Sequence, residues 1–237
     1  IDVALLYQRD LFKLLSSRSI SIPPLKQYRP TRDLLHVSGL LLTGDTLDVF
    51  VCHLPSRSGG AKESESYRLY AAHILRMEVD SIMSIRSLPQ VIIMGDFNDY
   101  PTNQSIQKIL EAEAPPVTTN NLASTTGSTN FSTVAPSSLK LYHLLARKAK
   151  SKDFGSYKYR GEWGLLDHLI VSGTLLNQSN HFFTSEEKAN VCLLPFLLKD
   201  DEKYGDKEPF RTYKGMKYQG GVSDHLPIYA DFELILY

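Results

Sequence analysis

The feature that most constrains the fold is a short apolar run, Val91-Ile92-Ile93-Met94, which leads into Gly95-Asp96-Phe97-Asn98. A continuous apolar run bounded by glycine predicts a strand that is buried on both faces. Because side chains two residues apart on an extended chain point the same way, Asp96 and Asn98 would face one spot at the strand's end. A carboxylate there can hold a cation or a water, and an amide can donate to a phosphate oxygen. The same residues also fit an ordinary turn completed by Asp99-Tyr100-Pro101.

Length and composition indicate one large globular domain. The chain has 237 residues and a formal net charge of zero, and this length allows a substantial core. Dedicated nucleic-acid binders usually carry a basic excess, so the charge gives a nucleic-acid substrate no support, although it does not exclude one. The two cysteines, Cys52 and Cys192, have no metal-site spacing and do not indicate a disulfide framework. No apolar run reaches the roughly 18 residues of a transmembrane helix.

Strand and helix patterns alternate along the chain. Apolar or alternating runs predict strands at 1–7, 19–22, 31–42, 47–53, 91–94, 156–159 and 165–172. Apolar spacing predicts a long helix over 63–85, and further helical segments are expected at 105–112 and 139–149. Two regions predict surface structure, a Pro-, Thr-, Ser- and Asn-rich loop at 114–138 and a charged, aromatic segment at 186–219.

Polar groups interrupt or end four of the predicted strands: His53, Asp96 with Asn98, Asp167 with His168, and Asp224 with His225. Burying such groups in apolar strands is costly unless they are paired or bind a metal. Any one of them alone fits a structural pair or a turn better than a site. Four on neighbouring strands are hard to explain as structure alone.

The residue types at these strand ends indicate the chemistry. Oxygen ligands with histidines nearby suit Mg²⁺ or Mn²⁺ better than Zn²⁺. The sequence has neither a serine nucleophile elbow nor a glycine-rich phosphate loop. The pattern therefore predicts attack of a water on a phosphoryl group without a covalent intermediate.

These motifs, taken in order, resemble the endonuclease/exonuclease/phosphatase superfamily. The resemblance rests on Gly95-Asp96-Phe97-Asn98, Leu166-Asp167-His168, Ser223-Asp224-His225-Leu226-Pro227 and Cys52-His53-Leu54-Pro55-Ser56. The superfamily includes pancreatic-type deoxyribonuclease, the exonuclease III class, inositol polyphosphate 5-phosphatases and neutral sphingomyelinases. The resemblance implies an α+β fold, a four-layer αββα sandwich of two mostly antiparallel sheets like that of deoxyribonuclease I, in a single domain over residues 1–237.

The resemblance also implies roles for individual residues. His225 resembles the histidine that contacts the scissile phosphate, and Asp167 the residue that orients it. Asp96 resembles the residue that positions or deprotonates the attacking water, Asn98 a donor to the phosphate, and Asp224 a metal ligand.

Further positions carry weaker expectations. His53 resembles a second histidine that assists the leaving group or binds phosphate. Arg57 and Arg68 are expected to contact a substrate phosphate. His168 matches no role in the family and is expected to be structural.

One part of the family pattern is missing. The first strand with its Asn, and the Glu that is the family's main metal ligand, would precede Ile1. The resemblance therefore implies an N-terminally incomplete domain with weak metal binding and low activity. Such a chain would be completed by a separate N-terminal segment or by self-association.

The expected function is that of an Mg²⁺- or Mn²⁺-dependent phosphoesterase that hydrolyses phosphodiester bonds, with a nuclease favoured. The alternatives are a phosphatase or phospholipase C-type enzyme for inositol phosphates or sphingomyelin, and a non-catalytic binding module. A cluster of aromatic and basic residues, Tyr157-Lys158-Tyr159-Arg160 with Trp163, could stack bases or line a lipid or sugar phosphate pocket. Packing alone is the simpler account of that cluster.

Overall fold

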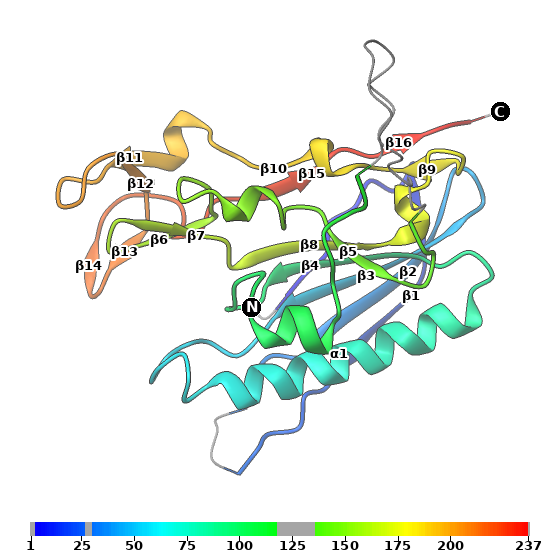
Figure 1. Ribbon diagram of the computed structural model, residues 1–237, viewed down its shortest axis with the longest axis horizontal. Helices are drawn as coiled ribbons and strands as arrows, with labels where there is room; N and C mark the ends of the chain where they lie inside the picture. The colour runs from blue at the N-terminus through cyan, green and yellow to red at the C-terminus, as the bar shows by residue number, and fades with distance from the viewer. Residues whose placement is uncertain (1–2, 27–29, 118–135, 237) are drawn as a thin grey trace, which may run out of the picture.

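A six-stranded sheet forms the centre of the computed structural model, which describes residues 3–26, 30–117 and 136–236 (Figure 1). Its strands, in spatial order, are β1 (Phe12–Ile20), β2 (Leu34–Leu41), β3 (Thr46–His53), β4 (Gln90–Asp96), β8 (Asp167–Ser172) and β5 (Leu141–His143). All neighbours pair antiparallel except β3 and β4, which are parallel. The expectation of a mostly antiparallel sheet is therefore confirmed.

One long helix, α1 (Glu65–Ile85), covers one face of this sheet (Figure 1). It connects β3 to β4, as a parallel pair requires, because the chain must cross back before the second strand begins. Leu75 and Val79 of α1 are fully buried in one cluster with Phe50 and Ile93 of the sheet. The helix predicted over 63–85 is confirmed to within two residues.

Short antiparallel ladders cover the opposite face (Figure 1). They are β10 (Ala189–Val191) with β15 (Ile228–Ala230), and β9 (Phe182–Phe183) with β16 (Glu233–Leu234). A second apolar cluster fills the space between these ladders and the sheet. The mixed α/β architecture agrees with the expected fold class, although in the described residues the second sheet consists of these short ladders and no α-helix covers it.

Three further hairpins extend one end of the molecule (Figure 1, left). They are β6 (Tyr157–Tyr159) with β7 (Glu162–Gly164), β11 (Leu198–Asp200) with β12 (Lys207–Pro209), and β13 (Tyr213–Lys214) with β14 (Lys217–Tyr218). Single helical turns complete the elements: η1 (Ser105–Ile109), η2 (Lys148–Lys150), η3 (Gly173–Leu176), η4 (Glu186–Lys188) and η5 (Pro195–Leu197). Among the described residues, no helix has the length and apolar character needed to span a membrane.

Three sequence predictions of secondary structure are wrong. Residues 3–7 form no strand, and β1 begins at Phe12 rather than near residue 19. The helix predicted over 139–149 is replaced by β5, a turn and η2, because β5 pairs with β8 at the sheet edge. Such tertiary pairing overrides a local helical pattern. The loop predicted at 114–138 lies mostly outside the described residues.

Gly95 allows β4 to approach β3 closely at the end of the parallel pair. Its φ is 131°, a conformation that L-residues rarely adopt, and a Cβ atom there would lie 2.0 Å from the carbonyl oxygen of Cys52. Neither β3 nor β4 can move aside without breaking the ladder that joins Cys52 to Gly95. Glycine is therefore required immediately before Asp96.

Replacing Gly95 by alanine tests this requirement. We expect Gly95→Ala to lower the free energy of unfolding by about 3 kcal/mol or more, because backbone strain and a backbone clash add. Gly44→Ala is the matched control, since Gly44 also has a positive φ, 85°, but open space around it, and we expect a loss of about 1 kcal/mol. Urea unfolding of the three proteins measures both losses, and equal losses would contradict the close approach.

Candidate active site

The register of three adjacent strands brings together residues that are far apart in the sequence. His53 pairs with Asp96 across the parallel ladder, and Asp96 pairs with Asp167 across the antiparallel one. Residues paired in this way have Cβ atoms about 5 Å apart and side chains on the same face of the sheet. The predicted histidine and the two carboxylates therefore share one end of the sheet.

His225 joins this end from the opposite layer. An isolated bridge pairs it with Tyr157, and the Leu226 amide donates to the Ser156 carbonyl at 2.7 Å. The Nδ1 atom of His225 lies 2.7 Å from Oδ2 of Asp167, which also accepts from the Ser156 hydroxyl. Asp167 thus holds the imidazole in one orientation and leaves its Nε2 atom free of that bond.

Asn98 follows Asp96 in a left-handed turn, with φ of 51°. Its backbone N–H donates to Oδ1 of Asp96 at 2.7 Å, and its side-chain amide donates to the Leu54 carbonyl at 3.0 Å. Asparagine tolerates this conformation better than most residues. The turn therefore fixes both Asp96 and Asn98, with the Nε2 atom of His53 3.5 Å from the Asp96 carboxylate.

The proximity of two carboxylates changes the proton affinities in the cluster. Burial and the nearby Asp167 carboxylate raise the pKa of Asp96 to about 6, against the opposing effects of His225, the Asn98 N–H and Arg32. Burial works to lower the pKa of His225, but the hydrogen bond and charge of Asp167 outweigh it, so this pKa is raised. Burial, Arg32 and His225 lower the pKa of His53. Near neutral pH, Asp96 is thus poised close to its ionisation point.

The same cluster has the donor set of a cation site. Asp96, Asp167 and His225 each offer a ligand atom, and these three atoms lie within 4.8 Å of one another. A divalent cation would neutralise the two crowded carboxylates, and this donor set fits Mg²⁺ or Mn²⁺. Asp224, the metal ligand expected from the sequence, lies exposed beside His225 and outside this group of three.

The structure does not support the prediction that Arg68 contacts substrate. Its side chain is 2% exposed and forms an ion pair with Asp99 at 2.8 Å. It also donates to the Ser64 hydroxyl and the Ala61 carbonyl. Arg68 therefore joins the start of α1 to the turn after Asn98.

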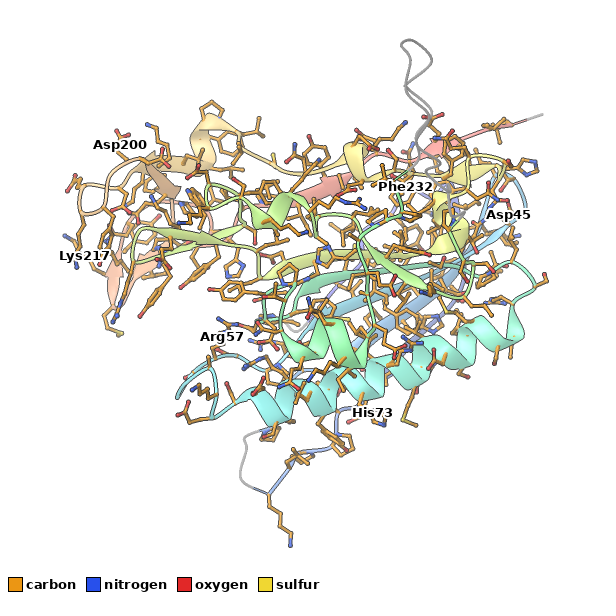
Figure 2. All side chains as sticks on the ribbon, in the orientation of Figure 1. Asp45, Arg57, His73, Asp200, Lys217 and Phe232 are labelled. Atoms are coloured by element: carbon orange, nitrogen blue, oxygen red, sulfur yellow. The ribbon has the colours of Figure 1, made fainter. Side chains whose placement is uncertain are left out.

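Arg57 lies in the loop between β3 and α1, where Figure 2 labels it. Its Nε atom donates to the Asn98 carbonyl at 2.7 Å, and its guanidinium stacks 4.3 Å from the centre of the Tyr100 ring. A quarter of its side chain stays exposed. Arg57 supports the Asn98 turn from the open side, so a phosphate contact is sterically available to it.

His168 is structural, as expected. It is fully buried, its Nε2 atom lies 2.8 Å from the Asp99 carbonyl and its Nδ1 atom lies 2.6 Å from Nε2 of His143. Burial lowers the pKa of both histidines, that of His168 to about 4. Two neutral rings, each donating once, satisfy this chain of hydrogen bonds.

Sequence reasoning missed Arg32 and Ser156, and it named Tyr157 only within the aromatic and basic cluster. Arg32 acts electrostatically on His53 and Asp96, Ser156 donates to Asp167, and the ring of Tyr157 lies 4.9 Å from that of His225. None has a recognisable spacing from the catalytic motifs. Only the pairing of β6 with the segment around His225 brings Ser156 and Tyr157 to the site.

Comparison with known structures shows a shared fold. The chain matches the human Nocturnin catalytic domain with bound sulfate at 19% identity and a TM-score of 0.50, covering 97% of this chain and 62% of that one. It matches D. rerio TDP2 complexed with a single-strand DNA product at 14% identity and 0.53, covering 95% and 70%. It matches a Bacteroides thetaiotaomicron mannosyl-6-phosphatase at 16% identity and 0.54, covering 95% and 68%.

The chain thus spans less than two thirds of the Nocturnin structure. A search of curated protein sequences found no match. The model of one family, described as the Endonuclease/Exonuclease/phosphatase family, matches residues 1–234. Since this match covers nearly all of the sequence, the chain belongs to the Endonuclease/Exonuclease/phosphatase family.

Proposed function

We propose that the protein is a divalent-metal-dependent phosphoesterase that cleaves a phosphodiester by in-line attack of an activated water. The observation that carries the proposal is the cluster of Asp96 and Asp167, at the ends of adjacent strands, with His225 from the opposite layer. Membership in a family named for nucleases and phosphatases supports it. An endonuclease- or exonuclease-like activity is the first candidate.

Each residue of the cluster has a role that its geometry permits. Asp96, ionised above pH of about 6, accepts a proton from the attacking water or aligns it. His225, oriented by Asp167 through Nδ1, presents Nε2 to a phosphoryl oxygen. His53 lies across Asp96, and because its lowered pKa favours the neutral ring, it can donate a hydrogen bond to a phosphate oxygen.

The phosphate is held by groups around this cluster. Asn98 would donate its amide to a phosphoryl oxygen after exchanging the bond to Leu54, and Arg57 would contact phosphate from the open side. A bound Mg²⁺ or Mn²⁺ would supply Lewis-acid stabilisation of the developing charge. Its ligands would come from the Asp96 and Asp167 carboxylates, with Asp224 as a further candidate, because Asp167 and the phosphoryl oxygen occupy the two ring nitrogens of His225.

A small phosphate ester is the second candidate substrate. The zero formal net charge gives no electrostatic support for binding a nucleic-acid strand, which usually requires a basic surface. A phosphatase or phospholipase C-type activity on smaller esters needs no such surface.

Substitution at the cluster tests the catalytic assignment. We expect Asp96→Asn and His225→Gln each to lower kcat on bis(p-nitrophenyl) phosphate with Mn²⁺ by about a thousandfold, because each removes a group that handles a proton or charge in the transition state. Asp200→Asn is the control, since Asp200 is exposed on β11 (Figure 2). Circular dichroism checks that all variants are folded. Turnover close to wild type in either cluster variant would reject the assignment.

The raised pKa of Asp96 predicts a pH-dependent stability difference. Its pKa is higher in the folded protein than in the unfolded chain, so the wild type loses stability as pH rises from about 4 to above 6. Asp96→Asn removes this loss. We therefore expect Asp96→Asn to be more stable than wild type by about 3 kcal/mol at pH 7, and this difference to fall below about 1 kcal/mol at pH 4. Urea unfolding at both pH values measures it, and a constant difference would contradict the shift.

Metal binding can be measured without turnover, from the Tm of the protein. We expect Mn²⁺ at pH 7 to raise the Tm of the wild type by neutralising the carboxylates, and to raise that of Asp96→Asn much less. A Tm increase without phosphoesterase turnover would indicate a non-catalytic binding module. An equal Tm increase in both proteins would place the cation elsewhere.

A further inference from the structure

A cavity adjoins the candidate active site and has no part in the chemistry described above. Its volume is about 710 Å³, within the range of pockets that bind small organic ligands. Four aromatic side chains line it: Tyr100, Phe154, Tyr159 and Trp163. Three of them come from segments that also build the catalytic cluster.

The chain connects the cavity wall to the catalytic cluster along three separate segments. Tyr100 lies two residues after Asn98, Tyr159 two residues after Tyr157, and Leu165, another lining residue, two residues before Asp167. Two residues of extended chain span about 7 Å. A group attached to a phosphate at the cluster can therefore reach the near wall of the cavity.

Two tyrosine rings connect His225 of the catalytic cluster to the cavity wall. The ring of Tyr157 lies 4.9 Å from His225 and 6.5 Å from the ring of Tyr159, with the two tyrosine planes within 12° of parallel. Tyr159 is 56% exposed, although it lines the cavity. Its ring is thus available to a ligand on the side that packing leaves open.

The charges on the cavity wall limit which ligand fits. The charged lining residues are Lys150, Glu113 and Glu162, and the guanidiniums of Arg57 and Arg160 lie over the rings of Tyr100 and Tyr159, so charges of both signs surround the cavity. The flanking phosphates of a nucleic-acid strand, or the several phosphates of an inositol polyphosphate, need a strongly basic surface, and a wall of mixed charge does not provide one. An uncharged ring that carries hydroxyl groups suits the wall, because its C–H face packs on aromatic rings while its hydroxyls donate to carboxylates.

We propose that this cavity binds an uncharged sugar ring esterified to the phosphate that the catalytic cluster attacks. The inference rests on the proposed phosphoesterase function and adds its substrate class. Tyr159 and Trp163 pack against the ring, and Glu162 accepts from its hydroxyls. The phosphate then lies toward Asn98 and His225.

The fluorescence of Trp163 can report ligand binding in the cavity, because Trp163 lines it and is the single tryptophan of the chain. We expect its emission to change saturably when the full chain is titrated with neutral methyl pyranosides of glucose, mannose or galactose. Tyr159→Ala should weaken the best of these at least fivefold, because it removes a ring that packs on the sugar. Tyr213→Ala, at an equally exposed tyrosine of the β13–β14 hairpin, should leave the titration unchanged.

Other outcomes would overturn the proposal. These are no response to any pyranoside, an equal response in Tyr159→Ala, or a response only to adenosine or to inositol hexakisphosphate. Because these sugars carry no phosphate, the titration does not depend on turnover. Asp96→Asn should bind the sugar with the same affinity as the wild type. The titration therefore distinguishes failure of the sugar site from failure of the catalytic assignment.

Discussion

Two carboxylates, Asp96 and Asp167, oppose each other across neighbouring strands, and the surroundings of the site reduce the repulsion between them. The backbone N–H of Asn98 donates to one, and His225 with Ser156 donates to the other. These hydrogen bonds do not fully offset burial and the repulsion between the two carboxylates, so the pKa of Asp96 stays raised. The fold holds this unfavourable pair because the β4–β8 ladder fixes the register, and a cation or a water is what the pair is suited to hold.

A second layer of buried polar groups holds the turn that carries Asn98. The Asp99 carboxylate, itself 2% exposed, binds Arg68 and accepts from Ser105, while its carbonyl lies against His168. Such groups are stable in the interior only because each has a partner. This layer explains why Arg68, which resembles a phosphate ligand in the sequence, serves the scaffold instead.

The elements that position the site were predictable because their patterns are strong and local. The apolar run before Asp96, the strand before His53 and the periodic stripe of α1 each specify one structure. The failures have a common physical cause. β1 has an exposed middle and no alternation of its own, and β5 is three residues long, so both depend on pairing with a neighbouring strand. A local pattern contains no information about a partner that is distant in sequence.

The amino-acid sequence alone specifies the residue types of the candidate site and the strands that carry them. It placed Asp96 beside Asn98 and gave each of the two histidines, His53 and His225, its position at a strand end or loop. Long-range contacts bring these residues together, namely the strand register and the pairing of β6 with the His225 segment. The tertiary structure also determines the raised pKa of Asp96, since burial and the distance to Asp167 exist only in the folded chain.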